Sequence, residues 1–129
     1  MRKAGIIASF ILMVCAAGCG TKLDITKSFE VPAGGDHILT VEKIKQEQTI
    51  KITGTATGAP VDVFVYLDSN KEKARKEILN RKSEQFILKK QEKAEAIDLA
   101  VLIPANEEAV VFVESTGKKA NVQLTITNR

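Results

Sequence analysis

The stretch that decides the fold reads Val61-Asp62-Val63-Phe64-Val65-Tyr66-Leu67. The valines and the leucine alternate along one face of an extended chain, whereas Phe64 and Tyr66 fall on the opposite face. A strand with large apolar side chains on both faces belongs in the middle of a sheet, where other elements cover both sides. We therefore expect residues 61–67 to form a central strand around which the other elements assemble.

On both sides of this strand, apolar and polar residues alternate with a period of two, which is typical of half-buried strands. The expected strands are, in chain order, 23–31, a strand with Leu39 and Val41 inward, 48–57, 61–67, 97–103, 109–115 and 122–126. Gly, Pro, Asn and Asp residues between them supply turns. We interpret residues 104–108 as a hairpin turn. The pattern predicts an all-β fold, an antiparallel β-sandwich of seven to eight short strands.

The segment that follows the central strand interrupts this pattern, because Lys, Glu and Ala dominate there. Ser69 and Glu72 have the spacing of a capping box, so we expect a short helical insertion near residues 70–80. On that helix Ala74 and Ile78 would share the inward side.

After the helix we expect a strand around residues 85–89, with Phe86 and Leu88 inward. The same composition also allows one continuous helix as far as Ala96, since Lys, Glu and Ala all favour helices. The sequence leaves both alternatives open.

The N-terminal segment has the three-part organisation of a bacterial export signal. Arg2 and Lys3 precede an uncharged apolar run of about 15 residues, short of the roughly 20 that a membrane-spanning helix needs. The run ends in Ala16-Ala17-Gly18-Cys19, which resembles a lipobox, the recognition motif of the lipoprotein signal peptidase. Three small side chains let the backbone lie close to a peptidase, and the thiol of Cys19 can accept a diacylglycerol thioether.

We therefore divide the chain into a removed signal peptide at 1–18, an acylated tether at 19–22 and a single domain at 23–129. The mature protein would carry diacylglycerol and an N-acyl lipid on Cys19, with no other cofactor. These lipids would hold it at the cell membrane or the outer membrane. A plain secretory signal cut near Ala17 is the alternative. Cys15 is a poorer acylation site because bulky residues precede it.

Composition limits the mature chain further. The full sequence has 19 basic and 16 acidic residues, and loss of Arg2 and Lys3 with the signal leaves 17 against 16. A net charge near +1 gives no support for nucleic-acid binding. Cys15 would leave with the signal and Cys19 would carry lipid, so no disulfide can form within the domain. Burial of Val, Ile and Leu must therefore hold it together.

Three parts of the chain together resemble a known class of domain. They are the opening strand and glycine turn Phe29-Glu30-Val31-Pro32-Ala33-Gly34-Gly35, the strand from Val61 to Ser69, and the two closing strands from Val111 to Ile126. They are similar to the β-sandwich modules of secreted bacterial proteins called pre-peptidase C-terminal domains, and to the related GOLD-like domains. The Lys-rich segment between Lys71 and Lys93 departs from that pattern. The resemblance implies an accessory module that binds or spaces, and it carries over no catalytic residue.

Residues suited to catalysis or metal binding are few. His37, the single histidine, follows Asp36 beside a glycine turn, and we interpret it as a solvent-exposed turn residue. A Ser-His-Asp hydrolase would also need a positioned nucleophile, and no Gly-x-Ser-x-Gly motif is present. A zinc site would need three or four converging His, Cys or carboxylate ligands. We therefore assign no catalytic residue and no metal ligand.

The basic residues are unevenly distributed. Residues 71–93 contain nine basic and four acidic side chains, a net charge of +5, which leaves the rest of the mature chain near −4. The candidate contacts for a polyanion are Lys71, Lys73, Arg75, Lys76, Arg81 and Lys82. Each cation close to an anionic membrane contributes on the order of 1 kcal/mol to binding. The alternative is a solvated helix face with i,i+4 pairs such as Glu72 with Lys76.

Two functions from different classes follow. The first, which we favour, is a membrane-anchored, non-catalytic β-sandwich that binds an envelope protein or an anionic polymer, or serves a structural role. The second is an enzyme with a site that sequence motifs do not reveal. We do not expect a nucleic-acid partner, because an exported protein seldom meets one and no aromatic residues alternate with the basic ones.

Overall fold

The computed structural model describes residues 23–81 and 84–128. The predicted signal peptide, the lipobox and the tether that begins at Cys19 lie outside these residues. Within them the elements are β1 (Asp24–Val31), β2 (Asp36–Val41), β3 (Gln48–Thr57), β4 (Val61–Leu67), a 3₁₀ turn η1 (Asp68–Asn70), α3 (Lys71–Asn80), β5 (Ile87–Ala94), β6 (Ala96–Ile103), β7 (Ala109–Ser115) and β8 (Ala120–Thr127).

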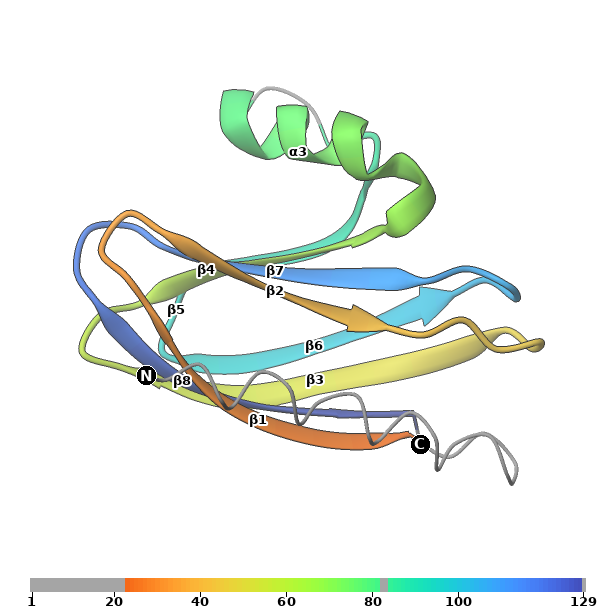
Figure 1. Cartoon of the computed structure of the whole chain (residues 1–129), viewed down its shortest axis with the longest axis horizontal. Coiled ribbons are helices and arrows are strands. Elements are labelled where there is room, and N and C mark those ends of the chain that lie inside the picture. Colours follow the sequence, from red (N-terminus) through yellow and green to blue (C-terminus); the bar gives the residue numbers. More distant parts are fainter. Residues whose placement is uncertain (1–22, 82–83, 129) are drawn as a thin grey trace.

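The strands form two antiparallel layers, and α3 lies on the outside of one of them (Figure 1). The predicted β-sandwich with one short helix is confirmed.

The two sheets have the strand orders β1-β8-β3-β6 and β2-β7-β4-β5, called here sheet A and sheet B. Consecutive strands lie in different sheets at every step except from β4 to β5. The hairpin expected at residues 104–108 is therefore wrong, because β6 pairs with β3 whereas β7 pairs with β2 and β4. Turn-forming residues show that the chain reverses there, but they do not show which sheet receives the next strand.

The core lies between the sheets and follows the predicted two-residue period. In β6, for example, the alternate residues from Ile97 to Ile103 are buried and those between them are exposed. Strand β4 is central, as expected, since it pairs with β5 on one side and β7 on the other. Its first six residues are buried, so both of its faces are covered.

Helix α3 provides the cover on the outer face of sheet B. Its residues Ala74 and Ile78 are buried against Phe64, Tyr66 and the outward side chains of β7. The inward pair predicted for the helix is confirmed. The alternative of one helix to residue 96 is excluded, because β5 begins at residue 87 and pairs with β4.

Two local expectations around α3 are wrong. Ser69 does not cap the helix: its hydroxyl donates to Glu107 Oε1 at 3.1 Å, and Asn70 occupies the N-cap position. In β5, Leu88 is 39% exposed, while its neighbour Ile87 packs beneath the helix with Phe86. The β4–β5 pairing shifts between Val65 and Tyr66, and such an irregularity changes which residues face inward.

Side chains connect the edge strands of the two sheets. On one side the side-chain amide of Gln91 in β5 accepts a hydrogen bond from the N–H of Asp98 at 2.9 Å and donates one to the carbonyl of Ala96 at 3.0 Å. It thus satisfies two backbone groups at the edge of β6 that no neighbouring strand in the described part of the chain pairs with. On the other side the rings of Phe29 in β1 and His37 in β2 stack with centroids 4.0 Å apart. Bonded or covered edges are less available to pair with other chains.

Strand β3 comes close to β8 at Gly54, where a Cβ atom would lie 2.0 Å from the carbonyl oxygen of Gln123. We expect Gly54→Ala to lower the free energy of unfolding by about 3 kcal/mol, because one of the two backbones must shift. Gly117→Ala is the matched control, since no atom lies within 4 Å of a Cβ built there. Urea denaturation of both variants checks this, and equal midpoints would contradict it.

Candidate functional site

A buried carboxylate marks the end of the surface that α3 covers. The side chain of Asp62 in β4 is 6% exposed. Its Oδ1 accepts the backbone N–H of Lys93 at 2.8 Å, and its Oδ2 lies 3.3 Å from the guanidinium of Arg81. A buried carboxylate is costly unless it is paired with a cation and hydrogen-bonded. Asp62 has both kinds of partner, Arg81 from the C-terminal end of α3 and Lys93 from the end of β5.

Both partners of Asp62 have left-handed backbone conformations. Arg81 ends α3 with φ 56°, and its N–H bonds to the carbonyl of Glu77 at 2.8 Å. Lys93 has φ 54°. A residue with a side chain in this region costs on the order of 1 kcal/mol and persists where surrounding contacts hold it. Here the shared contact is the carboxylate of Asp62.

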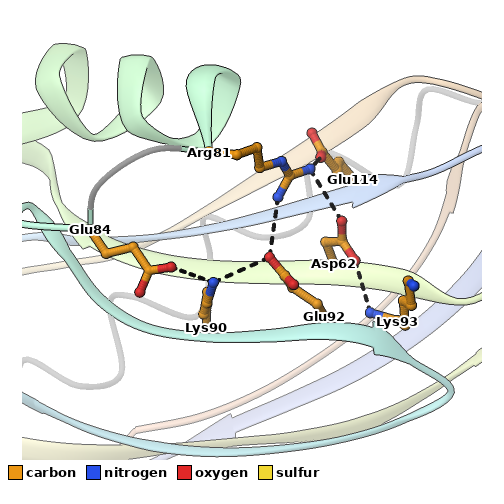
Figure 2. Close-up of polar contacts among 7 residues, drawn as sticks. All are labelled: Asp62, Arg81, Glu84, Lys90, Glu92, Lys93 and Glu114. Carbon is orange, nitrogen blue, oxygen red and sulfur yellow. Dashed lines mark hydrogen bonds and ion pairs between the residues drawn. The ribbon is translucent and has the colours of Figure 1, made fainter.

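The guanidinium of Arg81 connects α3 to three strands (Figure 2). Besides Asp62 it pairs with Glu114 of β7 and with Glu92 of β5, and it lies 5.2 Å from the ring centre of Phe64. Burial raises the pKa of the Glu114 carboxyl, and the positive charge of Arg81 acts in the opposite direction. The contacts together make Arg81 a clamp that holds the C-terminal end of α3 on sheet B.

Lys90 of β5 extends this charged cluster. Its ammonium group pairs with Glu84 and lies 3.3 Å from Glu92, and the hydrogen bond that it donates to the Glu84 carboxylate raises the pKa of Lys90 (Figure 2). A hollow of about 410 Å³ opens beside the cluster, between the end of α3 and β5. At its wall Arg81 pairs with Asp62 and Glu92, and Lys90 pairs with Glu84 and Glu92, so these ion pairs stabilise the position of the helix.

Five of the six candidate polyanion contacts lie within the described residues, and they serve in two different ways. Arg81 is held in the cluster, and Lys82 lies outside the described residues. Lys73, Arg75 and Lys76 are exposed along α3, and Lys71 near its start lies 4.0 Å from Asp68.

Two of the exposed cations lie over aromatic rings. The ammonium of Lys73 is 5.0 Å from the ring centre of Phe86, and the guanidinium of Arg75 is 6.0 Å from that of Phe112. Leu79, on the same helix, is 81% exposed. We call Lys73, Arg75, Lys76 and Leu79 together the α3 outer face.

Sequence patterns did not reveal the charged cluster around Arg81. Its members come from α3, β4, β5 and β7, so no local spacing relates them. One signal was present: Asp62 is the only charged residue in the apolar stretch 61–67. A charge in a strand that must be covered on both faces requires a partner from the covering element.

The structure corrects the expectation for His37. This residue lies within β2 rather than in a turn, and its ring is partly buried against Phe29. Burial lowers the pKa of its imidazole, whereas the nearby carboxylate of Asp36 opposes that shift.

No group of three His, Cys, Asp or Glu side chains in residues 23–81 and 84–128 is arranged to hold a metal ion. In the same part of the chain, no helix is long and apolar enough to cross a membrane.

Comparison with solved structures supports the sandwich. A pre-peptidase C-terminal domain of collagenase from Bacillus anthracis has a TM-score of 0.59 and 12% identity, covering 81% of this chain and 89% of that one. The Yersinia pseudotuberculosis-derived mitogen has a TM-score of 0.58 and 8% identity, covering 84% and 87%. PliG from Aeromonas hydrophila, a periplasmic inhibitor of g-type lysozyme, has a TM-score of 0.54 and 8% identity, covering 84% and 88%.

At these identities the similarity shows the fold alone. It supports the β-sandwich that the resemblance to pre-peptidase C-terminal domains implied. No family model matches the sequence, and no curated protein matches it.

Removal of the Arg81 clamp tests its contribution to stability. We expect Arg81→Ala to lower the free energy of unfolding by about 2 kcal/mol, since Asp62 loses its cation, although the partial exposure of Arg81 moderates the loss. Amide hydrogen exchange in α3 should accelerate. Lys71→Ala, which removes the exposed pair with Asp68, should cost less than about 0.5 kcal/mol. Equal losses in the two variants would show that Arg81 is not a clamp.

The lowered pKa of His37 predicts a pH dependence. The folded chain disfavours the imidazolium, so the unfolded chain binds a proton first as the pH falls. The contribution of His37 to stability should be complete above about pH 6.5 and lost as the pH falls through its folded-state pKa. Urea denaturation at pH 7.5 and 5.0 should show a smaller drop for His37→Phe than for the original chain. Equal drops would refute this.

Proposed function

We propose that this chain is a lipid-anchored protein of the bacterial cell envelope whose β-sandwich acts as a non-catalytic binding module. The motif Ala16-Ala17-Gly18-Cys19 supports the anchor. The observation that carries the binding role is the surface of α3. This helix is inserted into a complete sandwich, is clamped through Arg81 and presents cations outward.

The charged groups of the cluster favour binding over catalysis. The carboxylates of Asp62, Glu92 and Glu114 all pair with the guanidinium of Arg81, whereas an acid–base catalyst has to present its group to a substrate. The sandwich fold also occurs in a mitogen and in a lysozyme inhibitor, so it is compatible with a binding role.

A second candidate function is contact with anionic lipid or an anionic envelope polymer. The exposure of Lys71, Lys73, Arg75 and Lys76 favours it. Lys71 is partly engaged by Asp68 at the start of the helix.

The test of the proposed function uses three forms of the full chain in its native host. We expect the original chain and Cys15→Ser to fractionate with membranes, with an intact mass that begins at Cys19 and includes acyl groups. Cys19→Ser should lose both properties. Proximity labelling should recover the same envelope component from the first two forms and lose it in the third. Unchanged processing and fractionation of Cys19→Ser would refute the anchor, and no enriched component from any form would refute the binding role.

A further inference from the structure

The α3 insertion is longer than its connecting role requires. Strands β4 and β5 are antiparallel neighbours, and two residues suffice to join such a pair. Residues 68–86 stand between them instead. Coverage of the aromatic side chains of sheet B explains the inward residues Ala74 and Ile78, but it does not explain the opposite side of the helix.

The outward side of α3 is positively charged and partly fixed in place. The carboxylate of Glu77 accepts hydrogen bonds from the backbone N–H groups of Gln85 and Phe86, at 3.0 and 2.8 Å. It therefore stabilises the segment after the helix. Glu72 is the acidic residue that stays exposed among the cations. Lys73 and Arg75 rest on rings and therefore lose less side-chain freedom when they bind a partner.

We propose that the α3 outer face binds an acidic segment of an envelope protein, with Leu79 as the apolar contact among the cations. This inference rests on the proposed binding function and names its partner. Charge complementarity selects an acidic segment. Single exposed leucines are common on protein surfaces, but protein interfaces characteristically surround an apolar contact with a polar rim. A purely anionic polymer would leave Leu79 in water.

A lipid surface fits this face less well. A helix that lies on a membrane buries a broad apolar side in it. The apolar side of α3 is already used, because Ala74 and Ile78 are buried on sheet B. The helix also lies on sheet B, whereas β1, which follows the predicted tether in the sequence, belongs to sheet A (Figure 1). With sheets about 10 Å apart and a helix about 10 Å wide, the α3 outer face points away from that layer.

The experiment places a photoreactive residue at position 79 of the full chain in the native host. A second chain carries the same residue at position 53, because Thr53 is exposed on the outward face of sheet A. We expect position 79, and not position 53, to cross-link one envelope protein, and the linked peptide to be net negative when mapped by mass spectrometry.

Charge reversal then tests the contact itself. Lys73→Glu, Arg75→Glu and Lys76→Glu together should reduce cross-linking from position 79 about tenfold or more. Reversal of the mapped acidic residues in the partner to Lys should restore it. The matched control changes Lys43, Lys45 and Lys51 to Glu, which alters the charge equally at exposed positions outside α3, and it should leave the yield unchanged. A further variant changes Lys73, Arg75 and Lys76 to Gln instead of Glu. Hydrogen exchange in α3 of this variant should be unchanged, so that a lower cross-linking yield reports lost binding and not an unfolded helix.

Each contrary outcome is distinct. Cross-links from position 79 to lipid or polymer alone, or to a protein segment without net negative charge, overturn the inference. So does an equal loss in the control variant. A protein captured from position 53 alone overturns the inference and leaves the proposed binding function standing. No envelope component from either position overturns both.

Discussion

Strand β4 is buried on both faces, and the rest of the structure depends on that constraint. Its inward valines lie in the core between the sheets, while Phe64 and Tyr66 on the outward face are 2% and 1% exposed. A sheet face that carries large rings gains stability when it is removed from water. The chain meets this need locally, because α3 follows β4 directly and folds back over it before β5 pairs on the far side.

Because β4 is covered on both faces, its charged residue Asp62 requires a cation and hydrogen-bond partners within the fold. It lies on the outward face of β4, at the margin of the area that α3 covers, where its side chain is only 6% exposed. Its partners Arg81 and Lys93 both adopt left-handed conformations to reach it. The charge cluster therefore lies where the helix ends and where the β4–β5 register shifts, between Val61 and Val63. It adds directional contacts to the non-directional burial of aromatic side chains.

Those parts of the fold that depend on neighbouring residues could be predicted from the sequence. The bounds of β3 and β4 follow from alternating side chains and flanking turn residues, and both match the structure. The hairpin expected at residues 104–108 does not form, because β7 pairs with β2 and β4 in the other sheet. Those partners lie far from residues 104–108 in the sequence, so local turn residues do not indicate them. The spacing of apolar residues predicts Leu88 inward, because spacing alone does not show the shift in the β4–β5 pairing. The sequence likewise does not separate Arg81 from the exposed cations of the segment, since the carboxylates that hold it come from three different strands.

Packing on sheet B determines the residues on the inner side of α3 but not those on its outer side. Its inner side is determined by the fold, because any larger or charged residue at Ala74 or Ile78 would meet the rings of sheet B. Its outer side is not, because Lys76 and the 81% exposed Leu79 can change without disturbing that contact. Lys73 and Arg75 connect the two sides, since their charged ends are exposed while each lies over a ring of the covered layer. The requirements of folding thus fix the position of the helix and orient two of its cations, and they leave the identity of Lys76 and Leu79 undetermined.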